Sequence, residues 1–276
     1  MDPDAVADMG AGGLTREVIQ DNLAFREARI ARLTGENGWL TQVGRYPLER
    51  GPNALPIGTV TLDDQGVVTL AVPAGETVTF QGQPIRDKVL RSDAEGPPDA
   101  IVHQGRSYEL IRRGEIYAVR VRDPHSARRR TFPGTEWFPV RPEWRITATF
   151  QPFAEDQLIS IPYDLGPVLS RSPGRVALKI QGRDFLLDCL MDDERRRLFI
   201  LFSDATNHDL TYPAGRFLYT PLPDPRSGQV IVDFNRALNP ACAFSEFVTC
   251  PLPPPQNRLP LRIEAGEKRY PPTATD

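Results

Sequence analysis

Apolar residues recur at every second position through much of the first half of the chain, from Trp39 to about Thr149. Three β-branched runs, at residues 57–64, 66–73 and 76–85, are separated by turn residues that include Asp-Gln-Gly and Pro-Ala-Gly. Because successive side chains of a strand point to opposite faces, this period gives each strand one buried and one exposed face. The pattern predicts antiparallel strands that pack into a β-sandwich-like domain.

The second half of the chain has the same character. Its clearest strand places Val176, Leu178 and Ile180 on one face, and Gln181-Gly182 follows as a turn. The chain has 28 prolines, about twice the usual share, and many of them lie between short apolar runs. Proline disrupts helix interiors and central strands, so this usage favours short strands and turns over long helices.

The predicted exception is an amphipathic helix over residues 16–33. Apolar residues recur there at near-helical spacing, namely Val18, Ile19, Leu23, Phe25, Ile30 and Leu33. Thr15 is in position to cap the helix at its N-terminus, and the Asn37-Gly38 pair ends it. We expect the apolar stripe to pack on the sheet core.

The predicted fold class is therefore mainly β, with an N-terminal amphipathic helix followed by two packed antiparallel β subdomains of the sandwich or roll type. At 276 residues the chain is long enough for two modest domains, each with its own core. The predicted boundaries are residues 1–13 for a disordered leader, 14–38 for the N-terminal helix, 39–150 for the first β-sandwich-like domain, 151–270 for the second β domain and 271–276 for a tail.

The composition of the chain indicates which classes of partner it can bind and in which compartment it is expected. The net charge of −3 argues against a broad surface for nucleic acid or acidic lipid. No run reaches the roughly 20 apolar residues of a membrane helix, and the acidic N-terminus lacks the apolar stretch of a secretory signal. Three cysteines are few, and odd in number, for a disulfide framework. We therefore expect a cytoplasmic protein with no nucleic-acid or membrane partner, and its oligomeric state stays open.

Several segments of the last third resemble the uncharacterised bacterial family DUF1684. They are TYPAGRFLY at residues 211–219, VDFNRALNPACAF at 232–244 and TCPLPPPQNRLPLRIEAGEK at 249–268. Two earlier segments resemble the same family, TGENGWL at 34–40 and RVRDPHSARRRTFPGTEWFPVRPEWRITATF at 120–150. The resemblance spans nearly the whole chain from about residue 20. It implies no activity, because the family is named for having none assigned.

Residues 51–58 and 75–93 resemble the opening strand and a late turn of forkhead-associated β-sandwiches. That fold binds phosphothreonine through an Arg after the opening Gly, a Ser/His pair and an Asn. Here Thr59 follows Gly58, and Gln81-Gly82 stands in place of Asn-Gly. The resemblance therefore implies the sandwich fold without phosphopeptide binding.

The candidate site lies in the last third of the chain, where polar residues are dense. Strand alternation places Asp233 and Asn235 on one face, and Tyr212 and Arg216 come from a nearby segment. In one interpretation they form a pocket in which Arg216 holds an anionic group and Asp233 accepts a proton or a hydrogen bond. In the other they form a buried structural network, with Asp233 paired to Arg216 and Asn235 capping a turn, because buried polar groups must be paired in either case.

Asn239 and Cys242 complete the candidate set. The turn at Asn239-Pro240 can present Cys242 to the same region. Cys242 and Cys250 fit three interpretations: a structural or redox-active pair, a nucleophile served by His208, or part of an incomplete zinc site. Three further residues receive no site role: Cys189, predicted to lie in the core, and His103 and His125, predicted to be exposed.

The sequence contains no phosphate loop, nucleophile elbow, HExxH motif or dinucleotide fingerprint. We therefore predict no cofactor and no metal, and the question of an enzymatic activity stays open. The predicted function is the binding of a small molecule, with anions among the candidates, in a pocket of the C-terminal β domain. The predicted ligand-binding residues are Tyr212, Arg216, Asp233, Asn235, Asn239 and Cys242. The alternative is a non-catalytic interaction module whose polar cluster is structural.

Overall fold

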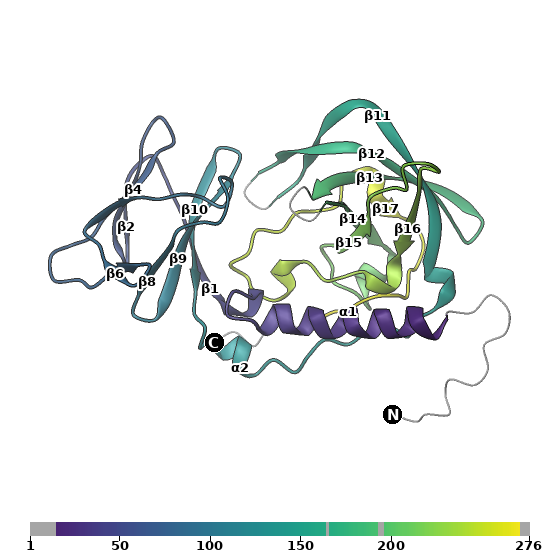
Figure 1. Ribbon diagram of the computed structural model, residues 1–276, viewed down its shortest axis with the longest axis horizontal. Helices are drawn as coiled ribbons and strands as arrows, with labels where there is room; N and C mark the ends of the chain where they lie inside the picture. The colour runs from purple at the N-terminus through teal and green to yellow at the C-terminus, as the bar shows by residue number, and fades with distance from the viewer. Residues whose placement is uncertain (1–14, 164–165, 193–195, 271–276) are drawn as a thin grey trace. The chain divides into compact units, whose positions relative to one another are not determined.

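The computed structural model describes residues 15–163, 166–192 and 196–270, so the predicted leader and tail lie outside the described residues. The protein is mainly β, as predicted, with one long helix, α1 (Arg16–Thr34). It forms two compact units (Figure 1). Unit 1 comprises Met1–Ala31, Pro133–Ala243 and Cys250–Asp276, and unit 2 comprises Arg32–Phe132 and Phe244–Thr249.

Unit 2 contains two antiparallel sheets that share one apolar core. Their strand orders are β1-β10-β9-β8-β5-β6 and β2-β3-β4-β7. The strands are β1 (Gln42–Pro47), β2 (Gly51–Leu55), β3 (Gly58–Leu62), β4 (Val68–Ala71), β5 (Thr79–Phe80), β6 (Gln83–Pro84), β7 (Asp87–Val89), β8 (Ala100–His103), β9 (Arg106–Arg113) and β10 (Ile116–Arg122). In β4 the buried residues Val68 and Leu70 alternate with exposed ones, and they meet Leu110 and Val119 of the other sheet in the core. The predicted period of two is thus confirmed.

His103 corrects one expectation about the surface of this unit. It was predicted to be exposed, but only 6% of its surface is accessible, and its ring Nδ1 lies 3.0 Å from the Thr77 carbonyl oxygen. The reason is the alternation of β8, which places His103 on the same buried face as Ile101. His125 is exposed, as predicted.

Unit 1 is built on one seven-stranded sheet. The strand order is β15-β14-β13-β12-β11-β16, and β17 pairs in parallel with β14. The strands are β11 (Arg145–Ile161), β12 (Val168–Ile180), β13 (Arg183–Asp192), β14 (Arg197–Asp204), β15 (Arg216–Pro221), β16 (Gln229–Asp233) and β17 (Arg258–Leu259). The end strands β15 and β16 lie close together: the Thr220 hydroxyl of β15 donates to the Ile231 carbonyl of β16 at 2.6 Å. The sheet therefore curls around its core toward a barrel (Figure 1).

The core of unit 1 includes the face predicted from the sequence. Val176, Leu178 and Ile180 are all buried, and they pack in one cluster with Leu187 of β13 and Phe202 of β14. The Gln181-Gly182 turn between β12 and β13 has positive φ at both residues, 49° and 76°. This is the type I′ geometry whose twist suits a two-residue hairpin.

The division of the chain differs from the predicted boundary between residues 150 and 151. Strand β11 runs through that point without a break, and its residues 145–149 pair with residues 229–233 of β16. Because both partners belong to unit 1, this unit resumes at Pro133 rather than at residue 151. The pairing joins segments about 80 residues apart, which strand periodicity cannot reveal.

The face that helix α1 buries is more polar than the predicted stripe. Leu33 is buried, but Leu23 is 39% exposed. The buried positions of the same face include Asn22 and Arg29, which are polar. The helix is present as predicted, and its docking depends on hydrogen bonds as well as on apolar contact.

We predict that Leu187→Ala destabilises unit 1 by about 2–5 kcal/mol, because it removes a fully buried side chain and leaves a cavity. Urea unfolding followed by far-UV circular dichroism measures the change. Leu169→Ala is the matched control, because Leu169 in β12 is 64% exposed and its truncation leaves stability nearly unchanged. Equal stability of Leu187→Ala and the wild type would contradict the assigned core.

Candidate functional site

A buried ion pair lies where β14 ends. The fully buried guanidinium of Arg216 donates a hydrogen bond to the carboxylate of Asp204, whose side chain is also fully buried. It donates further to the carbonyl oxygens of Ala265, at 2.6 Å, and Ile263, at 3.0 Å. Burial lowers the pKa of Arg216, and the attraction of Asp204 opposes that shift. The pair thus ties β14, β15 and the segment after β17 to one point.

Asp204 also begins the 3₁₀ turn Ala205–His208. Its Oδ1 accepts the backbone N–H of Thr206 at 2.8 Å, while Oδ1 of Asn207 accepts the backbone N–H of Asp204 at 2.6 Å. The bond to Asn207 is one half of a capping box, whose other half runs from the Asn207 backbone N–H to the Asp204 side chain. Asn207 donates in addition to the Thr211 hydroxyl at 3.0 Å. The turn is therefore held by its own hydrogen bonds, and it fixes the position of His208.

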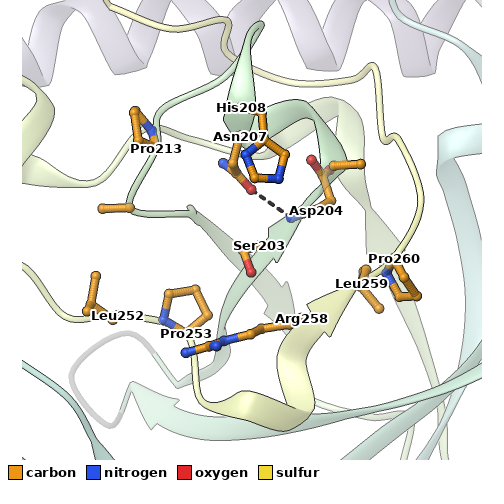
Figure 2. A pocket seen from close by; sticks show the side chains of 12 residues that line it. Ser203, Asp204, Asn207, His208, Pro213, Leu252, Pro253, Arg258, Leu259 and Pro260 are labelled. Carbon is orange, nitrogen blue, oxygen red and sulfur yellow. Dashed lines mark hydrogen bonds between the residues drawn. The ribbon is translucent and has the colours of Figure 1, made fainter.

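A hollow of about 550 Å³ opens beside this turn (Figure 2). Its lining comes from the end of β14, the 3₁₀ turn, the segment before β15 and the proline-rich segment around β17. The lining residues are Ser203, Asp204, Ala205, Asn207, His208, Pro213, Ala214, Leu252, Pro253, Arg258, Leu259 and Pro260. Most of the wall is apolar, so the hollow can accept a molecule with an apolar part.

Three polar side chains of the hollow are not engaged elsewhere. Within the described residues, no hydrogen bond or ion pair involves the side chain of Ser203, His208 or Arg258. In the view of Figure 2 the Ser203 hydroxyl lies between the imidazole of His208 and the guanidinium of Arg258. Since Arg216 neutralises Asp204, Arg258 supplies the uncompensated charge. The hollow therefore offers a cation and two smaller hydrogen-bonding groups to a ligand.

Two predicted site residues, Asp233 and Asn235, belong to a different network. β16 ends at Asp233 and Asn235 lies in the following 3₁₀ turn, so strand alternation does not relate them. Asn235 donates to Asp233 Oδ1 at 2.9 Å, and Asp233 Oδ2 accepts from Asn22 of α1 at 3.3 Å. Asn235 also bonds the backbone N–H and C=O of Arg141, both at 2.9 Å. Arg216 makes its hydrogen bonds with Asp204 and the backbone, not with Asp233.

Asn239 lies in a second contact with α1. Arg29 of the helix pairs with the fully buried Glu267 at 2.9 Å and donates to the Asn239 carbonyl at 2.9 Å. Glu267 also accepts the backbone N–H of Asn239 at 2.6 Å, and the Asn239 amide donates to the Lys268 carbonyl at 2.8 Å. These bonds pair the buried charges of Arg29 and Glu267 and hold the helix against the rest of unit 1.

Cys242 is joined to Cys250 by a disulfide, with 5.6 Å between the two Cα atoms. Of the three interpretations drawn from the sequence, the structure agrees with the first, in which Cys242 and Cys250 pair with each other. The Tyr212 hydroxyl donates to the Cys242 carbonyl at 3.1 Å, so these two predicted site residues are in contact, and neither of them lines the hollow. Cys189 is fully buried, as predicted.

Comparison with known proteins identifies the family. The family described as "Protein of unknown function (DUF1684)" matches residues 130–268, slightly more than half of the chain. The chain belongs to the DUF1684 family. The match leaves out the segment TGENGWL at 34–40, and it includes every residue that lines the hollow.

Among solved structures, this DUF1684 protein is similar to the solution NMR structure of an uncharacterized protein of Haloarcula marismortui. The identity is 30% and the TM-score is 0.43, over 51% of this chain and 78% of the other. No curated protein matches the chain.

Little in the sequence indicates the hollow of this DUF1684 protein. Of its three unengaged residues, only His208 was considered from the sequence, and then as a base for a cysteine. Arg258 lies beside Ser203 because β17 pairs in parallel with β14, with Ser203 opposite Arg258. A two-residue parallel pairing between distant segments leaves no periodic pattern, so no sequence signal marks it.

In the described part of this DUF1684 chain, no group of three or more His, Cys, Asp or Glu side chains is arranged to hold a metal ion. None of its helices combines the length and apolarity that crossing a bilayer requires.

We predict that Asp204→Asn destabilises unit 1 by about 3–5 kcal/mol, because it leaves the Arg216 guanidinium buried without its counter-ion. Urea unfolding measures the change. Asp209→Asn is the matched control, since the exposed carboxylate of Asp209 pairs with Arg262 in solvent and its loss leaves stability nearly unchanged. An Asp204→Asn variant as stable as the wild type would show that the ion pair is dispensable.

We also predict that the folded protein has no reactive thiol. Burial raises the pKa of Cys189 to about 12, against 9.0 for an exposed thiol, so it stays protonated in mildly alkaline buffer. Titration with DTNB at about pH 8 should detect no thiol in the folded protein and a single thiol after unfolding without reductant. Cys189→Ala should abolish that signal. Detection of all three cysteines after unfolding would contradict the disulfide.

The same pKa shift has a consequence for stability. Since the folded pKa of Cys189 lies above the unfolded one, its stabilising contribution is complete below pH 9 and is lost as the pH rises toward 12. The free energy of unfolding of the wild type should therefore fall faster over this range than that of Cys189→Ala.

Proposed function

We propose that the protein binds a small organic anion in the hollow beside the 3₁₀ turn Ala205–His208. The observation that carries the proposal is the uncompensated guanidinium of Arg258 in a largely apolar hollow. A carboxylate matches the fork of a guanidinium, and the apolar part of the ligand would pack against the proline and leucine side chains. Ser203 and His208 would provide the remaining hydrogen bonds.

The anion is placed at Arg258, whereas the prediction from the sequence assigned it to Arg216. Arg216 is fully buried, and its Nη1 and Nη2 atoms already donate to Asp204 and two carbonyl groups. A ligand at Arg216 would have to replace these bonds. Arg258 is exposed and needs no such exchange.

The proposal is limited to binding. A serine nucleophile needs a base within hydrogen-bonding distance, and that base needs a group to orient it. Among the described residues, Ser203 and His208 share no hydrogen bond, and the carboxylate of Asp204 is committed to Arg216 and the turn. The hollow thus has the parts of a recognition site rather than an assembled catalytic set.

A thermal-shift screen with small carboxylic acids tests this function, because a specific ligand raises the melting temperature of the protein. For an acid that stabilises the wild type, Arg258→Ala should weaken binding in calorimetry by about tenfold to a hundredfold, since a hydrogen-bonded charge is worth about 1.5–3 kcal/mol. The affinity should also fall as ionic strength rises.

Arg226→Ala is the matched control, because Arg226 is an exposed arginine of the same unit outside the hollow. Its affinity should equal that of the wild type. Equal loss in both variants would mean that the acid binds by general charge alone. If no acid stabilises the wild type, the alternative of a non-catalytic interaction module gains.

A further inference from the structure

A second hollow, of about 480 Å³, lies within unit 2. It is lined by the turn between β3 and β4, by β7 and the segment after it, and by the hairpin of β9 and β10. The lining residues are Gln65, Gly66, Val67, Val68, Val89, Leu90, Arg91, Ser92, Glu95, Leu110, Arg112 and Tyr117. Both sheets of the unit therefore contribute to its wall.

The hydroxyl of Tyr117 is the unusual group in this hollow. Tyr117 is only 4% exposed, yet within the described residues nothing forms a hydrogen bond with its hydroxyl. A Cβ atom added to Gly66 would lie 2.7 Å from that oxygen, so the hydroxyl lies against a residue without a side chain. A tyrosine as deeply buried as Tyr117 usually has a hydrogen-bond partner for its hydroxyl. Here the hydroxyl has no such partner among the described residues and is accessible from the hollow, so it can donate to a ligand there.

Two arginines add positive charge to the same hollow. Arg112 lies opposite Tyr117 across the hairpin, with Cζ 5.1 Å from the centroid of the tyrosine ring. It donates to the Gly114 carbonyl at 2.8 Å and to the exposed Glu115 at 3.3 Å, and its Nη1 is unengaged within the described residues. Arg112 can thus donate to a ligand without giving up its present bonds.

Arg91 is bound more loosely than Arg112. Its side chain is 53% exposed and lies 3.9 Å from Asp99, which Lys88 contacts more closely at 3.1 Å. The acidic residue in the lining, Glu95, already accepts from the backbone N–H and the hydroxyl of Ser92, at 3.0 and 3.2 Å. The lining thus carries two guanidinium groups and one carboxylate, and this charge balance favours an anion.

The rest of the hollow is apolar and partly open to solvent. Val67 is 41% exposed and Val89 is 62% exposed, and both are in the lining. Leu90 and Leu110 form the deeper, buried part of the wall. A bare inorganic ion would leave these surfaces in water, whereas an organic acid would cover them.

We propose that this hollow is a binding site for an organic acid with an apolar body, independent of the hollow in unit 1. The carboxylate would accept hydrogen bonds from the Tyr117 hydroxyl and from Arg112, with Arg91 adding charge. The apolar body would cover Val67 and Val89. The site uses residues of unit 2 alone, so it makes no demand on the function proposed for unit 1.

Benzoate is a suitable probe, because it joins a carboxylate to a flat apolar ring. The full-length Arg258→Ala variant removes the cation of the other hollow, and binding is followed there by the NMR shifts of the Gly66 and Val67 amides. Benzoate should shift these signals with saturation. Tyr117→Phe in the same background should weaken binding about tenfold, since it deletes one hydrogen bond to a charged group and keeps the ring.

Tyr46→Phe is the matched control, because Tyr46 is a 38% exposed tyrosine of the same unit outside the hollow. Its affinity for benzoate should equal that of the parent. Benzyl alcohol, which lacks the charge, and inorganic phosphate, which lacks the apolar body, should each bind more weakly. The proposal fails if benzoate does not shift the Gly66 signal, if Tyr117→Phe binds as tightly as Tyr46→Phe, or if either analogue matches benzoate.

Discussion

The Arg216–Asp204 ion pair is the constraint on which the architecture of unit 1 depends. Two charges fully removed from water cost several kcal/mol each, and their attraction offsets this only when further hydrogen bonds complete the geometry. Here the carbonyl groups of Ile263 and Ala265 and the capped turn after Asp204 provide those bonds. The ion pair thus holds the wall of the hollow in place, and it also makes the Asp204 carboxylate unavailable to a ligand.

The contact between helix α1 and the rest of unit 1 also depends on pairs of buried polar groups. The helix brings Asn22 and Arg29 into a buried face, and Asp233, Glu267 and the backbone at Asn239 receive them. Asn235 supports Asp233 from the other side. Dense polar residues in a sequence therefore marked a docking surface for the protein's own helix. In this region the structural network, one of the two interpretations of the sequence, accounts for the hydrogen bonds observed.

The proposed ligand sites differ from these networks in the partners of their polar side chains. The charged groups that α1 and Arg216 bring into the networks form ion pairs within the fold. Arg258 in one hollow and the Tyr117 hydroxyl in the other lack partners among the described residues, and each adjoins space and apolar surface. Unpaired polar groups beside a hollow are a better guide to recognition than the local density of polar residues, because density also arises wherever elements dock through hydrogen bonds.

The sequence by itself determined the secondary structure and much of the core. The period of two in β3, β4 and β12, the helical spacing before Gly38 and the turn at Gln181-Gly182 are local properties, so local residues encode them. The exposure of Leu23 shows the limit of prediction from local residues. The buried face of α1 depends on Asp233 and Glu267, which lie more than 200 residues away in the sequence.

Only the tertiary structure decided which polar residues meet. β17 pairs with β14 through two residues, which brings Arg258 to Ser203, and Arg216 takes Asp204 rather than Asp233 as its partner. Such choices depend on how distant segments pack, and no spacing along the chain records them. The sequence therefore showed that charged and amide side chains are concentrated in the last third of the chain. It did not show which of them hydrogen-bond within the fold and which remain available to a ligand.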